Sequence, residues 1–318
     1  MSEEPQVTVF APATVANVAC GFDILGFALE SPGDEVEASR RAERGVAIVS
    51  VTGDGGRLPT DPRRNTAGVA AQALLDETGC ADGVSLSVRK GMPLASGLGS
   101  SAASAVAAVV AVNELLGLKT APDVLLRSAV AAERAASGFG HADNSAACLH
   151  GGFVLVRGGP QFEVVSLPVP DGLACALLRP HIEVGTGASR ALLGETVLLK
   201  DAVVQWGNVA GLVAGLYRGD LSLVGRCLTD VVAEPKRAPQ VPGFDAVKRA
   251  ALDAGALGCS LSGSGPSLFA LCRSIAEARR VVTRMAEALK LSSGLAGDPH
   301  VSRISPAGAR VVPRAPRS

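Results

Sequence analysis

The stretch that decides how the rest of the sequence is interpreted is Pro93–Ala103, which reads PLASGLGSSAA. Gly97 and Gly99 let the backbone pass close to a bulky anion, because glycine has no Cβ. An apolar run follows, so Ser100 and Ser101 stand at the expected start of a helix. The first turn of a helix presents unpaired N–H groups and the positive end of its dipole. The stretch therefore predicts a phosphate-binding loop.

Two common nucleotide motifs do not fit this loop. No lysine follows the glycines, so it is not a Walker A loop. Its spacing matches the dinucleotide pattern G-x-G-x-x-A, but that pattern needs a strand directly before the first glycine. Here Gly91–Ser96 intervene, and the acids that follow, Glu114 and Asp123, fall in expected helices. A simple glycine- and serine-rich helix entry stays open as the alternative.

Composition narrows the class of protein. The chain has 318 residues, which is long for one core and predicts two domains. Thirty basic residues balance thirty acidic ones, so no strong field draws nucleic acid or a membrane surface. The single tryptophan and tyrosine, Trp206 and Tyr217, argue against a platform for stacking bases. A small-molecule enzyme fits these properties.

Cysteine usage and the N-terminus point to the cytoplasm. The seven cysteines form no C-x-x-C pair, which is typical of reduced, buried thiols. The opening residues MSEEPQ lack the basic and apolar regions of a signal peptide. The longest apolar run, near Ala102–Val112, is too short to span a bilayer. We expect a cytoplasmic protein.

The order of strand and helix patterns predicts two α+β domains, at residues 1–166 and 167–310, with a flexible tail at 311–318. In the first half, strands are expected at Val7–Phe10, Ile24–Phe27, Val36–Arg40, Val46–Ser50 and Val84–Lys90, and helices at Asn65–Glu77, Ser101–Leu116 and Pro122–Ala136. In the second half, strands are expected at Leu173–Leu178, Leu257–Ser262, Ser267–Cys272 and Val301–Ile304, with a loop at Glu234–Gly243.

Two further stretches are unusual for their position. Ser262–Pro266, which reads SGSGP, falls between two expected strands and is either a plain tight turn or a second phosphate contact. Pro12–Gly26, which reads PATVANVACGFDILG, carries Asn17 and Asp23 in an otherwise apolar run. Polar groups placed there must be paired, solvated or functional. The alternative to a functional role is that Asn17 and Asp23 make capping and turn hydrogen bonds.

Glu133 stands among alanines on the helix that follows the loop. Small neighbours leave room for a ligand beside its carboxylate, and Mg²⁺ takes carboxylate, hydroxyl and phosphate oxygens. Ser100 or Ser101 would supply the hydroxyl. A solvated helix residue is the alternative interpretation of Glu133.

Other polar residues are candidates for contact with a small molecule. His141, Asp143 and Asn144 share one short segment, but no further His or Cys completes a zinc site. The chain also lacks the G-x-S-x-G elbow of a serine hydrolase. Arg190 and Arg237 are candidates for gripping a carboxylate, although surface arginines are common.

Together these motifs resemble those of the GHMP small-molecule kinases. Among the members of that superfamily, they are most similar to the motifs of the homoserine kinases. The resemblance rests on PATVANVACGFDILG, PLASGLGSSAA, GHADN at Gly140–Asn144 and SGSGP in that order, and on DVVAEPKRAPQVPGF at Asp230–Phe244. It extends from about Val7 to Leu289. It implies a first domain like ribosomal protein S5 domain 2 and a ferredoxin-like second domain, with ATP and substrate between them.

The resemblance also implies roles for individual residues. ATP would be bound by Pro93, Leu94, Ala95, Ser96, Gly97, Leu98, Gly99, Ser100, Ser101, Ala102 and Ala103, with Gly263, Ser264 and Gly265 in support, and Mg²⁺ by Ser100 or Ser101 and Glu133. The substrate ammonium would meet Asn17 and Asp23, and its carboxylate Arg190 and Arg237. His141 and Asn144 would lie near the hydroxyl, with Thr186 lining the same pocket. The catalytic candidates are Asn144, His141 and Arg237.

The implied reaction is ATP-dependent phosphorylation of the L-homoserine hydroxyl, a step of threonine biosynthesis. Asn144 stands where relatives can carry an aspartate base, so we expect no dedicated protein base. Asp143 is the reserve candidate for a base.

The family usually has Gly-Pro where this chain has Ala19-Cys20. A kinase for another small alcohol and a catalytically silent binding protein are the alternatives. Only the resemblance suggests a homodimer.

Overall fold

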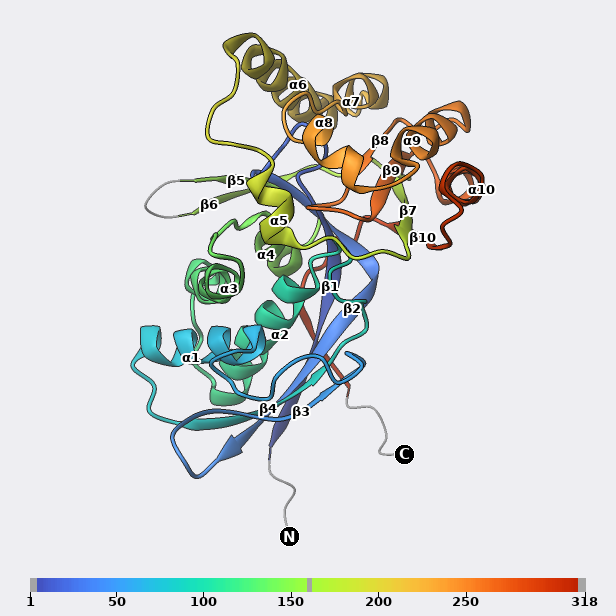
Figure 1. The fold of residues 1–318 in the computed structure, drawn as a ribbon. Coiled ribbons are helices and arrows are strands. Elements are labelled where there is room, and N and C mark those ends of the chain that lie inside the picture. Colours follow the sequence, from blue (N-terminus) through green and yellow to red (C-terminus); the bar gives the residue numbers. More distant parts are fainter. Residues whose placement is uncertain (1–4, 159–161, 314–318) are drawn as a thin grey trace.

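Two β-sheets with their helices make up the part of the chain that the computed structural model describes, residues 5–158 and 162–313. In Figure 1 the helices of the first half lie to one side of two long strands, and those of the second half lie at the other end of the molecule. This arrangement confirms the expected two-domain α+β fold.

The larger sheet has seven strands in the order β11-β1-β2-β4-β3, with β5 paired to β2 and β6 to β5. Only β3 and β4 pair in parallel. The strands are β1 (Gln6–Ala16), β2 (Leu25–Arg41), β3 (Gly45–Thr52), β4 (Gly83–Arg89), β5 (Phe153–Arg157), β6 (Glu163–Leu167) and β11 (Arg310–Val312). Within this sheet, the long β1–β2 pair extends toward the helices of the second half of the chain (Figure 1).

The smaller sheet is antiparallel and has the order β10-β7-β9-β8. Its strands are β7 (Ala174–Pro180), β8 (Gly258–Leu261), β9 (Leu268–Cys272) and β10 (Gly297–Arg303). The helices of the second half are α5 (Thr186–Ala191), α6 (Leu199–Arg218), α7 (Leu221–Cys227), α8 (Glu234–Arg237), α9 (Phe244–Asp253) and α10 (Ile275–Ser293), with a 3₁₀ turn η1 at Ala238–Gln240.

The first-half core is built around α2. The four helices are α1 (Thr66–Thr78), α2 (Ser100–Leu116), α3 (Pro122–Ser137) and α4 (Asp143–His150). Most of α2 is alanine and valine and is buried on all sides, against β1, β2 and the other three helices. A helix that is apolar all round belongs inside a protein. Its N-terminus, which follows the glycine loop, is thereby held at a fixed place.

One apolar core joins the two halves. The Phe27 ring on β2 lies 4.7 Å from that of Phe153 and 5.9 Å from that of Phe269, which belongs to the second sheet. All three rings are fully buried. Aromatic pairs at such separations add to the stability gained by burying their surface. The two domains therefore pack as one body in this region.

Three expectations about local structure were wrong. The strands expected at Ile24–Phe27 and Val36–Arg40 are one strand, β2. The expected loop at 234–243 contains α8 and η1, because the Asp230 carboxylate accepts hydrogen bonds from three backbone N–H groups and so caps a helical turn. The expected tail begins inside a strand, since β11 pairs with β1 and covers its edge.

Candidate active site

The glycine loop joins β4 to α2 and ends at the N-terminus of that helix. Gly97 and Gly99 have φ angles of 78° and 68°, in the left-handed region that favours glycine. A Cβ on Gly99 would lie 2.1 Å from the Thr14 hydroxyl oxygen, so no larger residue fits. The loop, together with Ser100 and Ser101, lines a cavity of about 400 Å³. The N–H groups of the first turn of α2 make this cavity suited to phosphate.

The second glycine turn lies against the first. The Ser262 hydroxyl donates a 2.7 Å hydrogen bond to the Gly97 carbonyl oxygen. The Ser267 N–H donates to the Ser96 carbonyl oxygen at 3.3 Å. A Cβ on Gly97 would lie 2.5 Å from the Ser262 carbonyl oxygen, so the close approach itself requires glycine. Two turns 165 residues apart in sequence thus form one wall.

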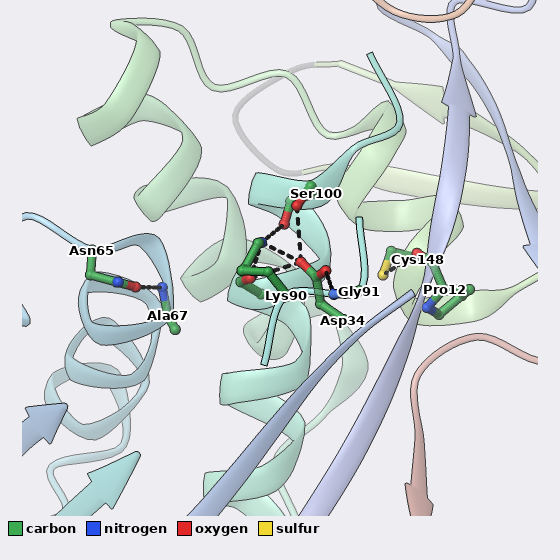
Figure 2. Close-up of polar contacts among 9 residues, drawn as sticks. Pro12, Asp34, Asn65, Ala67, Lys90, Gly91, Ser100 and Cys148 are labelled. Carbon is green, nitrogen blue, oxygen red and sulfur yellow. Dashed lines mark hydrogen bonds and ion pairs between the residues drawn. The ribbon is translucent and has the colours of Figure 1, made fainter. Parts of the chain in front are cut away.

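A buried ion pair fixes both ends of the glycine loop, and we call it the loop clamp (Figure 2). Asp34 on β2 bonds Lys90 and accepts from the Gly91 N–H at 3.0 Å. It also accepts from the hydroxyls of Ser100 at 3.1 Å and Ser104 at 3.0 Å. The Lys90 ammonium donates to the Ser104 hydroxyl and the Ser100 carbonyl oxygen as well. The end of β4 and the start of α2 are therefore held by one carboxylate.

Sequence reasoning missed the loop clamp, although one signal for Lys90 was available. Val84, Leu86 and Val88 alternate with polar residues and all point into the core. Lys90 is two residues further along, so the same alternation carries its side chain inward. The side chains of Lys90 and Asp34 are 2% and 0% exposed. A lysine on the apolar face of a strand needs a buried carboxylate as its partner.

The metal candidates lie beside the loop. Glu133 on α3 lines the 400 Å³ cavity, and its carboxyl oxygen Oε1 is enclosed. Burial raises the pKa of Glu133, while a hydrogen bond with the Ser101 side chain and the Lys90 charge act against that rise. The Ser100 hydroxyl is committed to Asp34 in the loop clamp. Ser101 with Glu133 is accordingly the better oxygen pair for a cation.

Protein side chains alone do not make a full metal cage here. Among residues 5–158 and 162–313, no three His, Cys, Asp or Glu side chains gather to hold an ion. Mg²⁺ commonly binds through one or two carboxylates plus substrate phosphates and water. The residues present fit a cation that arrives with a nucleotide rather than one bound permanently.

A second, smaller cavity of about 90 Å³ adjoins the first and is lined by charged groups. The Arg190 Nη1 atom lies 2.6 Å from Oδ2 and 2.9 Å from Oδ1 of Asp23. The His141 Nδ1 atom lies 3.3 Å from Asp23 Oδ2. Burial lowers the pKa of His141, and the Asp23 charge opposes that shift. One carboxylate and its basic neighbours thus share a small enclosed space.

The Phe22 ring lies close to both arginines of this cavity. The Arg190 and Arg237 guanidinium carbons lie 4.9 Å and 5.1 Å from the centre of the Phe22 ring. Arg237 is buried and donates to the Gly263 carbonyl oxygen at 3.1 Å. Phe139 contributes a further ring, 5.1 Å from the Arg190 guanidinium carbon. Attraction between a cation and a ring face offsets the repulsion between the two arginines.

Asn144 lies where the two cavities meet and lines both. Its side-chain oxygen accepts a 2.7 Å hydrogen bond from the Thr14 hydroxyl, so its NH₂ group is the donor available to a bound molecule. The preceding residue, Asp143, is buried and accepts from the Asn144 N–H at 2.9 Å. Burial, with a smaller contribution from the Asp23 charge, raises the pKa of Asp143 to about 7.

The structure places the predicted residues in two joined cavities. Leu94 through Ala102 line the larger one, and five residues line both, namely Glu133, Asn144, Thr186, Gly263 and Ser264. Asn17, Asp23, His141, Arg190 and Arg237 line the smaller one. Pro93, Ala103 and Gly265 line neither, and Gly265 instead lies against Gly97.

The family models that match the chain are GHMP kinases N terminal domain, over residues 65–152, and GHMP kinases C terminal, over residues 212–291. A homoserine kinase of Chlorobium phaeobacteroides (strain BS1) is 47% identical to this chain over 317 residues. The match covers 96% of this chain and 99% of that relative. The chain belongs to the homoserine kinase family. A second such relative, from Chlorobium phaeovibrioides, is 49% identical over 314 residues, covering 95% of this chain and 98% of its own.

A solved structure agrees with this membership. The crystal structure of homoserine kinase from Cytophaga hutchinsonii superposes with a TM-score of 0.93 at 49% identity, covering 98% of this chain and 99% of that one. The GHMP kinase family and the two-domain fold implied by the sequence motifs are confirmed.

The first motif of this homoserine kinase family member, at Pro12–Gly26, contains a turn with unusual backbone angles. Asn17, Val18 and Ala19 have φ angles of 68°, 43° and 58°, a left-handed turn without glycine. This conformation costs roughly 1–2 kcal/mol at each of Val18 and Ala19, because the Cβ crowds the following carbonyl oxygen, whereas asparagine tolerates it better. The Asp23 N–H donates to the Asn17 side-chain oxygen at 3.0 Å, which helps to hold the turn in shape.

Two further features of this homoserine kinase family member lie outside the site. None of the helices in the described part of the chain has the length and apolarity needed to cross a membrane. The seven cysteines are free thiols, and six of them are buried. Burial raises the pKa of Cys20 and of Cys259 to about 12, so these thiols stay protonated and unreactive near neutral pH.

Proposed function

We propose that the protein transfers the γ-phosphoryl group of ATP to the side-chain hydroxyl of L-homoserine, giving O-phospho-L-homoserine and ADP. The observation that carries this proposal is the shared wall between the two cavities. Glu133, Asn144 and Thr186 line both, so a nucleotide in one and an amino acid in the other would meet there. Membership of the homoserine kinase family supports the choice of substrate.

In this proposal the triphosphate lies against the glycine loop and the first turn of α2. The loop clamp keeps that backbone in place before the nucleotide arrives, which removes part of the ordering cost of binding. Ser101 and Glu133 would hold Mg²⁺, which would neutralise charge on the phosphate oxygens. Gly263 and Ser264 close the cavity from the second domain.

The amino acid is recognised by its two opposite charges. Asp23, supported by Asn17, takes the ammonium group, and Arg190 and Arg237 take the carboxylate. Asp23 and Arg190 contact each other, so a bound zwitterion would replace this one ion pair with two. A neutral alcohol or a hydroxy acid without an ammonium group satisfies only part of this set, which supports an amino acid as the substrate class.

Positioning, rather than proton abstraction by a protein base, carries the reaction in this proposal. Phosphoryl transfer has a loose transition state, so alignment and charge neutralisation supply most of the catalysis. The Asn144 NH₂ group orients the acceptor hydroxyl, with His141 beside it. Arg237 contributes by fixing the carboxylate end of the substrate.

Asp143 is the residue that tests the absence of a base. We expect Asp143→Asn to keep most of the turnover, because the carboxyl is buried and bonded to the Asn144 N–H. Since the pKa of Asp143 is raised to about 7 in the folded chain, its protonation stabilises the fold, and that contribution is lost as the pH rises through 7. Stability curves between pH 5 and 8 will be flatter in the variant. Abolished turnover in a well-folded variant that still binds both substrates would establish Asp143 as the base.

A substrate panel tests the proposed function directly. Each acceptor is offered with ATP and Mg²⁺, and ADP release is followed. The acceptors are homoserine, serine, threonine, mevalonate and shikimate. Homoserine should give the highest kcat/KM by a wide margin. Equal rates with mevalonate or shikimate would contradict the proposal, and so would an absence of ADP release with every acceptor.

The proposal includes the partners and the setting. The protein acts on two small molecules, takes no nucleic acid or membrane as partner, and works in the cytoplasm, where ATP is supplied. The net charge of zero and the buried thiols support this part.

A further inference from the structure

Asp230 is buried and lines neither cavity of the candidate site, yet its carboxylate accepts four hydrogen bonds. Its Oδ1 atom accepts from the N–H groups of Val232 at 2.8 Å and Ala233 at 3.0 Å. Its Oδ2 atom accepts from the Glu234 N–H at 2.8 Å. The fourth donor is the Gln205 side chain of α6, at 2.9 Å from Oδ1. Hydrogen bonds to a charged oxygen are about twice as strong as neutral ones, so this carboxylate fixes the backbone where α8 begins.

The helix that Asp230 caps is a single turn, and it carries one arginine of the proposed amino-acid site. Arg237 is the last residue of α8, and its N–H donates to the Ala233 carbonyl oxygen at 3.0 Å. The Glu234 side chain fastens the same turn to β8 by accepting from the Ser260 hydroxyl at 2.5 Å. A turn of four residues does not form by itself, because too few hydrogen bonds offset the loss of chain entropy. The position of Arg237 therefore depends on the cap at the other end of α8.

The second arginine, Arg190, depends on the same turn through Lys236. The Lys236 ammonium donates to the carbonyl oxygen of Leu193, just beyond the end of α5. The Leu193 N–H donates in turn to the Arg190 carbonyl oxygen at 3.1 Å. A lysine that bonds the last carbonyl groups of a helix stabilises that helix end. Figure 1 shows α8 between α6 and α5. One capped turn thus supports both guanidinium groups that would bind the substrate carboxylate.

Gln205 links the cap to the turn that carries Asp23. Its Nε2 atom donates not only to Asp230 but also to the Cys20 carbonyl oxygen, at 2.9 Å. Its Oε1 atom accepts from the Val231 N–H at 3.0 Å. Cys20 lies three residues before Asp23 in the first motif. Because Gln205 is buried and both of its amide atoms are bonded, it ties the Asp23 turn to the start of α8.

We propose that Asp230 is a positioning residue for the amino-acid substrate, one that sets the distance between the carboxylate that binds the ammonium group and the two arginines that bind the carboxylate. This inference rests on the proposed function, since it concerns the same site. Asp230 touches no substrate atom and acts through its neighbours: on Arg237 through α8, on Arg190 through Lys236, and on Asp23 through Gln205.

The size of the amino-acid cavity makes it sensitive to such positioning. Its volume is about 90 Å³, so charged groups on its walls have little room to adjust to a displaced partner. A misplacement of about 1 Å that originates far from the reacting atoms can lower a rate about 100-fold. The glycine loop is held separately, by the loop clamp and by Ser262. Loss of the Asp230 cap should therefore impair the amino-acid side and leave the nucleotide side intact.

Two variants that each remove a helix cap test the proposal, one at α8 and one at α7. Asp230→Ala removes the cap of α8. The matched control, Asp220→Ala, removes the cap of α7, where Asp220 accepts from the Leu223 N–H at 2.9 Å. Both variants should melt at a lower temperature than the wild type, because each loses hydrogen bonds at a helix start. Only Asp230→Ala should raise KM for homoserine, by about 10-fold to 100-fold, with KM for ATP nearly constant.

Asp230→Asn supplies an intermediate step. The asparagine oxygen can keep the bonds from Val232 and Ala233, but its NH₂ group meets the Glu234 N–H, which then has no acceptor. KM for homoserine should rise about threefold to 10-fold, less than in Asp230→Ala, and kcat at saturating homoserine should fall less than KM rises. This milder variant decides the question if Asp230→Ala does not fold.

Steady-state kinetics with each substrate varied in turn separate the outcomes, and circular dichroism confirms that each variant is folded. An unchanged KM for homoserine in both Asp230 variants would overturn the proposal. So would an equal rise in the two Michaelis constants, or the same rise for homoserine in Asp220→Ala, because either result would indicate a general loss of structure. A wild type that does not phosphorylate homoserine would contradict the proposed function and this inference with it. An active wild type with unaffected variants would contradict this inference alone.

Discussion

The two halves of the candidate site are built by different means. On the phosphate side, glycine backbone and a buried ion pair hold the loop through hydrogen bonds within the protein. On the amino-acid side, long charged side chains contact one another across a small cavity. The phosphate side is thus preorganised by the fold. The amino-acid side must exchange one set of ion pairs for another when substrate binds.

Because of this difference, variants on the two sides should affect different measured quantities. Changes on the phosphate side should affect folding and the binding of nucleotide or metal. Changes on the amino-acid side should affect one Michaelis constant and leave the fold intact. Four variants test that separation, two on each side.

The largest effect is expected in the loop clamp. Asp34→Ala leaves the buried Lys90 ammonium without a counter-charge and should lower the free energy of unfolding by about 3–5 kcal/mol. Denaturant melts measure the change. The double variant Asp34→Ala, Lys90→Met removes both charges and should recover much of the loss. A double variant no more stable than the single one would show that the ion pair is not what the loop depends on.

Arg237→Ala should give the next largest effect. Removing one buried charged contact to substrate costs about 2–5 kcal/mol, so KM for homoserine should rise about 30-fold or more while KM for ATP stays nearly constant. Steady-state kinetics with each substrate varied in turn provide the measurement. Arg249→Ala, at an exposed position on α9, is the control and should change neither constant. Equal increases in both constants would count against the assigned role.

Glu133→Ala should raise the Mg²⁺ concentration needed for half-maximal turnover. The loss of one charged oxygen contact is worth about 1.5–3 kcal/mol, or roughly 10-fold to 100-fold in metal requirement. A magnesium titration at saturating ATP measures it. Glu114→Ala, at an exposed position on α2, should leave the titration unchanged. An unaltered magnesium profile in Glu133→Ala would remove Glu133 from the metal site.

Phe22→Leu should give the smallest of the four effects. Two cation–ring contacts at about 0.5–1 kcal/mol each predict a rise in KM for homoserine of roughly 5-fold to 30-fold, with kcat and KM for ATP little changed. Phe22→Trp keeps a ring face for both arginines and should restore the affinity. A loss of the same size in Phe22→Trp would mean that the ring matters only as packing.

Much of the fold follows from local patterns in the sequence. Strand alternation and helix periodicity locate β4, α1, α2 and α3 to within one or two residues of their observed bounds. The glycine loop is recognisable because glycines followed by a helix start are a local signal. By contrast, β11 was missed, because its strand character depends on pairing with β1 from the other end of the chain.

Two of the missed parts of the site depend on contacts between distant residues, and a third on the local backbone. Asp34 and Lys90 are 56 residues apart, and no local pattern links a carboxylate on one strand to an ammonium on another. Phe22 was passed over because its ring acts through Arg190 and Arg237, which come from distant helices. The left-handed turn at Asn17–Ala19 contains no glycine, so nothing in its composition announces that backbone. Long-range contacts of this kind become visible only in three dimensions.

The contact of Gly97 with Ser262 and Gly265 limits how the protein moves during turnover. Opening the domains at that point would break the Ser262–Gly97 hydrogen bond and expose backbone that now lies in van der Waals contact. Hinge motion there is therefore disfavoured. We therefore expect the two domains to stay together at this contact while substrates exchange, and the ion pair between Asp23 and Arg190 of the short helix α5 to break when the amino acid binds.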